Sequence, residues 1–144
     1  MKIIGRLGER NLGNVTAILY APTAHINTPI RFYVDTGASA TTICDRDAQR
    51  ARVDYSHLRK VKAGIRGIGG DIDAYILPHC WIIFEFSKEN STHIEYLDNV
   101  VIMKHKQHTN ADHQRVRAIP SLLGLDVLRK YTVSFSNNHV ILEK

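Results

Sequence analysis

The stretch that decides the fold is Phe32-Tyr-Val-Asp-Thr-Gly-Ala-Ser-Ala-Thr-Thr-Ile43. An apolar strand delivers the carboxylate of Asp35 into a turn of small residues. Gly37 permits a tight backbone turn and the close approach of another chain segment. The hydroxyl of Thr36 can hold that turn in place. The pattern therefore predicts a single carboxylate presented by a short loop at the end of a strand.

Two further features follow this loop along the chain. The first is a glycine-rich turn, Gly64-Ile-Arg-Gly-Ile-Gly-Gly70, between the apolar segments Val61–Gly64 and Asp71–Leu77. Strands on both sides of such a turn predict a long hairpin. Its glycine spacing matches neither the dinucleotide nor the P-loop pattern. The second is the apolar run Leu122-Leu-Gly124, before a short helix expected at Asp126–Lys130.

The rest of the chain is typical of a mainly β domain with one or two short helices. β-Branched, aromatic and apolar residues predict strands at Val15–Ala21, Ile30–Val34, Thr41–Cys44, Cys80–Phe86, Ile94–Met103, Thr132–Ser136 and His139–Leu142. A surface helix capped by Asp45 is expected at Asp45–Arg52. The polar, basic, histidine-rich segment Lys104–Arg117 is interpreted as a loop.

Length and composition narrow the classes of protein. The chain has 144 residues, of which 44% are hydrophobic, and no linker or internal repeat, so we expect one domain over residues 1–144. Two cysteines, Cys44 and Cys80, are too few for a disulfide framework and are expected to be buried thiols. No apolar run reaches the length of a signal peptide or a membrane span, which predicts a cytoplasmic protein without membrane contact. The net charge of +5 is spread along the chain, so we expect no nucleic-acid partner.

The three features, in this order, resemble the retropepsin-like aspartic proteases, which comprise the retroviral proteases and cellular relatives such as the DNA-damage-inducible shuttle proteins. The resemblance spans Val15–Leu142, and the segment Leu122–Tyr131 is closer to the cellular relatives. It implies a closed, β-barrel-like acid-protease fold and a homodimer that cleaves peptide or protein substrates without a cofactor.

The resemblance also implies a role for each residue of the three features. Asp35 would be the catalytic carboxylate, supported in its loop by Thr36, Gly37, Ala38 and Ser39. The glycine-rich hairpin would be a flap that closes over the substrate with Gly67, Ile68, Gly69 and Gly70. Leu123 and Gly124 would pack behind the Asp35 loop.

The chemistry of this family explains why a dimer is expected. Hydrolysis of an amide without a metal or a covalent intermediate needs two adjacent carboxylates that share one proton. The chain has one Asp-Thr-Gly sequence. A two-fold symmetric dimer would supply Asp35 from each subunit.

Other interpretations stay open at this point. A non-catalytic retropepsin-like module could bind peptides or mediate dimerisation. A basic β-barrel could bind nucleic acid if aromatic side chains shared one strand face, which is not evident for Tyr20, Phe32, Tyr33 and Trp81. Ser39 lacks the G-x-S-x-G context of a serine nucleophile.

The segment Lys104–Arg117 admits two functional hypotheses. Three histidines, His105, His108 and His113, could bind a metal, although a solvated loop is the favoured interpretation and no metal is expected. The basic residues could instead edge the cleft and favour acidic substrates; these residues are Lys104, Lys106, Arg115 and Arg117.

Overall fold

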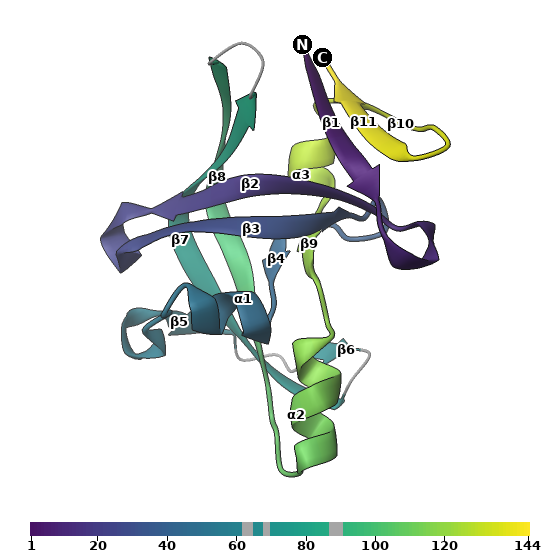
Figure 1. The fold of residues 1–144 in the computed structure, drawn as a ribbon. Helices are drawn as coiled ribbons and strands as arrows, with labels where there is room; N and C mark the ends of the chain where they lie inside the picture. The colour runs from purple at the N-terminus through teal and green to yellow at the C-terminus, as the bar shows by residue number, and fades with distance from the viewer. Residues whose placement is uncertain (62–64, 68–69, 87–90) are drawn as a thin grey trace.

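The computed structural model describes residues 1–61, 65–67, 70–86 and 91–144. The strands are β1 (Lys2–Leu7), β2 (Gly13–Ala21), β3 (Ile26–Val34), β4 (Thr42–Ile43), β5 (Arg59–Lys60), β6 (Ile65–Gly67), β7 (Gly70–Phe86), β8 (Ser91–His105), β9 (Ser121–Leu123), β10 (Thr132–Phe135) and β11 (His139–Glu143). The α-helices are α1 (Asp45–Arg50), α2 (Asn110–Arg117) and α3 (Leu125–Leu128), and 3₁₀ turns occupy Glu9–Asn11, Pro22–Ala24 and Tyr55–His57. Figure 1 shows the arrangement of these elements.

The centre of the molecule is a closed barrel. Its strands follow the order β2-β3-β9-β4-β8-β7, and β7 pairs back with β2 through Ile18–Ile83 and Tyr20–Trp81. Every second residue of β2 is buried, as the alternation of a half-buried strand requires. The largest fully buried side chains include Phe32 of β3 and Phe84 of β7. The expected mainly β, barrel-like fold with few short helices is therefore confirmed.

The longest pairing joins β7 and β8 in one continuous antiparallel register from Ile72–His105 to Phe86–Ser91. The sequence predicts two strands here, Asp71–Leu77 and Cys80–Phe86, separated at Pro78. The structure corrects this interpretation, because Pro78 pairs with Asn99 and the register is the same on both sides. His79, with a φ of 53°, accommodates the local distortion.

The segment Lys104–Arg117 is not the loop that its composition suggests. Strand β8 continues to His105, and α2 begins after Thr109. The Thr109 hydroxyl accepts a hydrogen bond from the Asp112 backbone N–H, and the Asp112 carboxylate accepts one from the Thr109 N–H. This reciprocal capping satisfies two donors at the helix start, and Val116 anchors the helix in the interior.

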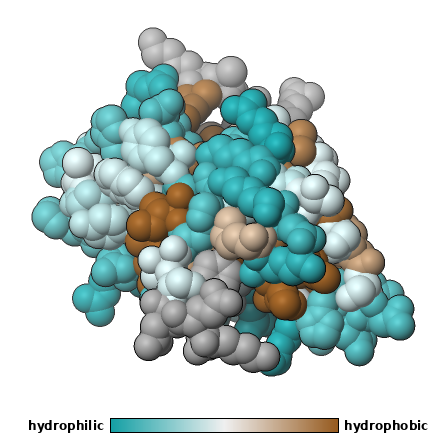
Figure 2. All heavy atoms as spheres, turned by 90° about the horizontal axis from the view of Figure 1, so that it is seen from above, coloured by the Kyte–Doolittle hydropathy of each residue, from teal (hydrophilic) through white to brown (hydrophobic). Residues whose placement is uncertain are grey.

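The two ends of the chain form a terminal sheet that is continuous with the barrel, because β1 pairs with β2 through Arg6–Asn14 and Leu7–Gly13. Strand β1 pairs with β11 from Lys2–Glu143 to Arg6–His139, and β10 covers the other edge of β11. The termini lie next to each other at the top of Figure 1. Seen from that end, the surface is mostly hydrophilic, with hydrophobic side chains in separate patches (Figure 2).

A buried carboxylate joins this terminal sheet to the barrel. Glu95 of β8 is 4% exposed and accepts hydrogen bonds from four side chains. The donors are Lys130 Nζ at 2.6 Å, Tyr131 Oη at 2.6 Å, Lys144 Nζ at 2.7 Å and His93 Nε2 at 2.8 Å. Burial alone would raise the pKa of Glu95, but these partners outweigh it and hold the pKa well below its usual value.

The depressed pKa of Glu95 predicts an acid-dependent loss of stability. Because the unfolded carboxyl binds its proton first as the pH falls, the contribution is complete above about pH 5 and decreases below it. The free energy of unfolding should fall between pH 6 and pH 3 by about 1–2 kcal/mol less in Glu95→Gln than in the wild type. Urea unfolding at each pH measures this difference. Glu85→Gln, at an exposed position of β7, controls for the loss of one negative charge. An unchanged pH dependence in Glu95→Gln would contradict the assignment.

The outer face of the barrel carries a row of aromatic rings. Tyr20, Trp81 and Tyr96 are register neighbours on β2, β7 and β8, with ring centroids 5.8 and 5.2 Å apart. The sequence does not suggest this shared face, because the three strands are distant along the chain. The exposed carboxylate of Asp98 interacts with Tyr96 at one end of the row, an unfavourable setting for a phosphate backbone.

The two cysteines are buried and free, as expected. Burial raises the pKa of both Cys44 and Cys80 to about 12, so neither thiol ionises readily. Among the helices of the described residues, none is long and apolar enough to cross a membrane.

Candidate active site

The Asp35 loop is held at the point where three strands meet. Strand β9 lies between β3 and β4, parallel to β3 through Val34–Leu123 and antiparallel to β4 through Thr42–Leu122. β3 and β4 are the strands that enter and leave the loop, so one strand fixes both of its ends. The Asp35 backbone N–H extends this pairing with a hydrogen bond to the Leu123 carbonyl at 3.1 Å.

Within the loop, the Asp35 side chain is fixed at one oxygen. The side-chain Oδ1 accepts a hydrogen bond from the Gly37 N–H at 2.8 Å. The backbone carbonyl of Asp35 accepts one from the Ala38 N–H at 3.2 Å. Oδ2 accepts no hydrogen bond from any described residue. Thr36, Gly37 and Ser39 are exposed beside it. The carboxylate is therefore oriented by its own turn and keeps one oxygen open.

Gly124 packs directly behind this loop. A Cβ atom at this position would lie 2.5 Å from the carbonyl carbon of Ala40 and 2.8 Å from the Thr41 nitrogen. No side chain fits against backbone atoms at such distances, so the close contact needs glycine. The Leu125 N–H also donates to the Ala38 carbonyl at 2.8 Å. Leu123 and Gly124 thus lie against the Asp35 loop.

A second carboxylate, Asp126, connects α3 to the far end of the loop. Its Oδ1 accepts a hydrogen bond from the Thr41 hydroxyl at 2.7 Å, and its Oδ2 accepts one from the Thr41 N–H at 2.8 Å. The same hydroxyl accepts a hydrogen bond from the Gly124 N–H at 3.1 Å. Sequence reasoning placed Asp126 only at a helix start. The signal it missed is long-range, because Thr41 and Asp126 are 85 positions apart.

The glycine-rich segment contributes to a hairpin, but β6 and the start of β7 fall inside the predicted turn Gly64–Gly70. Residues 62–64 of the predicted first strand, Val61–Gly64, lie outside the described residues. Strand β6 pairs with β7 through Ile65–Ile72 and Gly67–Gly70. Two of the predicted flap residues, Ile68 and Gly69, lie outside the described residues. The other two, Gly67 and Gly70, pair with each other across β6 and β7.

The family described as aspartyl protease matches residues 22–127, which include the Asp35 loop, the hairpin and the Leu123–Gly124 segment. This chain belongs to that aspartyl protease family. A retropepsin-like aspartic protease from Rickettsia conorii is similar in structure, with a TM-score of 0.56 and 18% identity over 99% of this chain and 90% of that one. The fold of this chain is therefore retropepsin-like.

The EIAV protease in complex with the inhibitor HBY-793 has a TM-score of 0.45 and 15% identity, over 85% of this chain and 90% of that one. No curated protein matches the sequence.

The aspartyl protease loop is supported at its back by a buried network. Asp47 of α1 is 1% exposed and accepts a hydrogen bond from the Ser121 hydroxyl at 2.7 Å. Ser121 in turn accepts one from the Cys44 N–H at 3.1 Å. The network fixes α1 to β9, the strand that holds the Asp35 loop.

Helix α1 also accounts for one of the three histidines. The helix begins at Asp45 with Cys44 as its N-cap, so Asp45 does not cap it as predicted. The Asp45 carboxylate instead binds both the backbone N–H and Nδ1 of buried His105. His105, His108 and His113 do not converge, and the described residues contain no group of three His, Cys, Asp or Glu that could hold a metal.

The basic residues predicted to edge the cleft have different environments. Lys104 Nζ lies 4.5 Å from the ring centroid of Tyr55, and Arg115 pairs with Asp112 at 3.1 Å. Arg117 lines a pocket between α1 and α2, and Lys106 is exposed. Of these four exposed residues, Arg117 alone lines the pocket.

Proposed function

We propose that this chain is an aspartic endopeptidase that works as a homodimer, with Asp35 from each subunit forming one catalytic pair. The observation that carries the proposal is the Asp35 carboxylate at the end of β3, with Oδ1 fixed by Gly37 and Oδ2 open. This arrangement suits a group that must bind a water molecule and exchange a proton in a defined direction.

The need for a second carboxylate supports the dimer. Two adjacent carboxylates cannot both carry a charge, so the pair holds one proton. Each chain has one Asp-Thr-Gly sequence. In the proposed dimer the exposed Thr36 hydroxyls would brace the two loops across the symmetry axis.

The reaction then needs no group beyond the pair. The ionised carboxylate takes a proton from a water molecule, whose oxygen attacks the scissile carbonyl carbon. The protonated carboxylate donates its proton to the carbonyl oxygen. When the tetrahedral diol collapses, the C–N bond breaks, a proton passes to the leaving nitrogen, and the pair is left with one proton as before.

The glycine-rich hairpin β6–β7 suits an extended peptide substrate. A peptide lying between the hairpin and the Asp35 loop could form strand-like hydrogen bonds with both. Closure of the hairpin would exclude bulk water from the pair. The substrate class that fits is therefore an unfolded segment of a protein.

The direct test is cleavage of an unbiased peptide mixture by the purified chain, scanned from about pH 3 to pH 7 and read by mass spectrometry. We expect cleavage with an optimum on the acidic side, because the pair must retain one proton. A folded, dimeric chain that cleaves no peptide would contradict the proposal and favour a non-catalytic peptide-binding module.

A further inference from the structure

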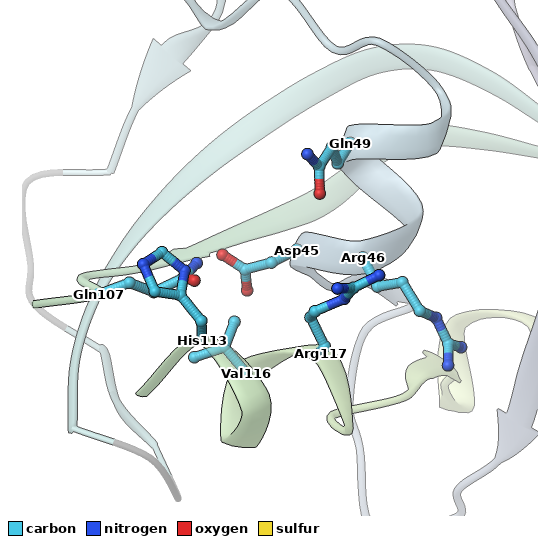
Figure 3. Close-up of a pocket in the computed structure, with 7 residues that line it drawn as sticks. All are labelled: Asp45, Arg46, Gln49, Gln107, His113, Val116 and Arg117. Carbon is cyan, nitrogen blue, oxygen red and sulfur yellow. The ribbon is translucent and has the colours of Figure 1, made fainter. Parts of the chain in front are cut away.

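A pocket of about 290 Å³ lies between α1 and α2, apart from the Asp35 loop. Figure 3 shows that its lining comes from α1, the segment between β8 and α2, and α2 itself. The lining residues are Asp45, Arg46, Gln49, Gln107, His113, Val116 and Arg117.

The pocket gathers hydrogen-bond donors that have no partner among the residues that the structure describes. The side chains of Gln49, Gln107, His113 and Arg117 form no hydrogen bond or ion pair with any described residue. Arg46 has only a long contact, 3.8 Å from Nε to Asp47 Oδ1. Several free donors around one cavity indicate a site for a group that accepts hydrogen bonds.

The charge of the pocket favours an anion. Two guanidinium groups, Arg46 and Arg117, line it against one carboxylate, Asp45. That carboxylate is already engaged by the N–H and the Nδ1 of His105. A guanidinium without a partner is suited to bind a carboxylate through paired hydrogen bonds.

The connections of the two helices place the pocket near the substrate path. Helix α1 follows β4, the strand that leaves the Asp35 loop, and α2 precedes β9, the strand that supports this loop. Leu122 pairs with Tyr33 beside the catalytic loop. Arg117 is five positions before Leu122, so the backbones of these two residues are at most about 18 Å apart. Figure 1 shows both helices on the same side of the barrel strands β2 and β3 as the β6–β7 hairpin.

We infer that this pocket binds the carboxylate side chain of an aspartate or glutamate in the peptide substrate, several residues away from the bond that is cut. Arg117 is six positions before Leu123, whose carbonyl accepts the Asp35 N–H, and an extended peptide advances about 3.3 Å per residue. At most about seven residues of an extended peptide therefore separate the pocket from Asp35. The inference rests on the proposed function and adds a substrate preference to it.

The test compares matched peptides that carry glutamate or glutamine at each position from three to seven residues on either side of a cleaved bond. For the wild-type chain we expect glutamate at one such position to lower KM about tenfold. Arg117→Glu should abolish this preference and leave cleavage of the glutamine peptides unchanged. Arg31→Glu, an exposed substitution of equal charge on β3, should keep the preference.

Two results separate failure of this inference from failure of the proposed function. Equal KM values for all wild-type peptide pairs, or a preference that survives in Arg117→Glu, would overturn the acidic pocket while leaving the protease intact. If no peptide is cleaved, the proposed function fails. The inference is then tested by direct binding of an acidic peptide to the pocket.

Binding is read from the side-chain amide NMR signals of Gln49 and Gln107 during titration with acetyl-Glu-Glu-amide. We expect both signals to shift in the wild-type chain, and neither to shift in Arg117→Glu or with acetyl-Gln-Gln-amide. Inorganic phosphate at the same concentration serves as a separate probe. Absent shifts, or a stronger response to phosphate than to the acidic peptide, would overturn the assignment to a substrate carboxylate.

Discussion

Replacement of Asp35 by asparagine should lower peptide cleavage by about 10³–10⁴-fold, because the proposed catalytic pair loses the group that exchanges protons with water and with the scissile amide. The substitution keeps the shape of the side chain and the Oδ1 atom that accepts the Gly37 N–H. The measurement is kcat/KM on the best peptide of the mixture, for the wild-type and variant chains side by side.

The structure predicts that this loss is chemical and not a consequence of unfolding. Asp35 lies at the surface end of β3 and contributes no buried ion pair. Circular dichroism and the thermal midpoint should therefore match the wild type. Asp98→Asn, which removes an exposed carboxylate of β8, should keep full activity. Activity of Asp35→Asn at the wild-type level would refute the assignment.

Replacement of Asp126 by alanine should cost about 3 kcal/mol of folding free energy. Thr41 is fully buried, and Asp126 accepts hydrogen bonds from both its N–H and its hydroxyl. Without the carboxylate, two buried donors lose their acceptor, at about 1–3 kcal/mol each. Urea unfolding at neutral pH measures the change.

Asp126→Asn is the matched control, because its amide keeps the size of the side chain and one acceptor oxygen. It should lose less stability than Asp126→Ala. Because Thr41 also accepts the Gly124 N–H, the alanine variant should disturb the Asp35 loop and lower kcat as well. A stability within 0.5 kcal/mol of the wild type, the ordinary range for surface substitutions, would show that the bridge does not support the loop.

The sequence predicts those parts of the fold that are determined by neighbouring residues in the chain. The apolar strand before Asp35, the small residues after it and the closing hairpin at the C-terminus each follow from neighbours in the chain. The resemblance to a known family predicts that Gly124 packs against the loop. The structure gives the physical reason, since a Cβ atom at this position would lie 2.5 Å from the carbonyl carbon of Ala40.

The parts that could not be predicted depend on distant contacts or on capping. Helix α2 has a polar composition with one buried residue, Val116, so hydrophobic periodicity gives no signal for it. Its only local sign is the spacing of Thr109 and Asp112, which form the capping box. Strand β1 pairs with β11 at the opposite end of the sequence, and a pattern of neighbouring residues cannot predict such a pairing.

The candidate site shows the same division. Asp35, Thr36 and Gly37 are adjacent in sequence and were predicted together. Asp126, which holds the far end of their loop, is 85 positions from its partner Thr41. Arg46 joins Arg117 in the pocket only because α1 packs beside α2.

The most direct test of the shared catalytic pair is dilution of the wild-type chain with an inactive one. Wild-type chain is mixed with a tenfold excess of Asp35→Asn under conditions where subunits exchange, and cleavage is measured at constant wild-type concentration. If each site needs Asp35 from both subunits, about one wild-type subunit in eleven keeps a wild-type partner, so activity falls about tenfold. The Asp35→Asn chain is labelled with ¹⁵N, so native mass spectrometry separates the mixed dimer from both homodimers of the 16.3 kDa chain and verifies exchange. Activity that stays unchanged after verified exchange would contradict the shared site.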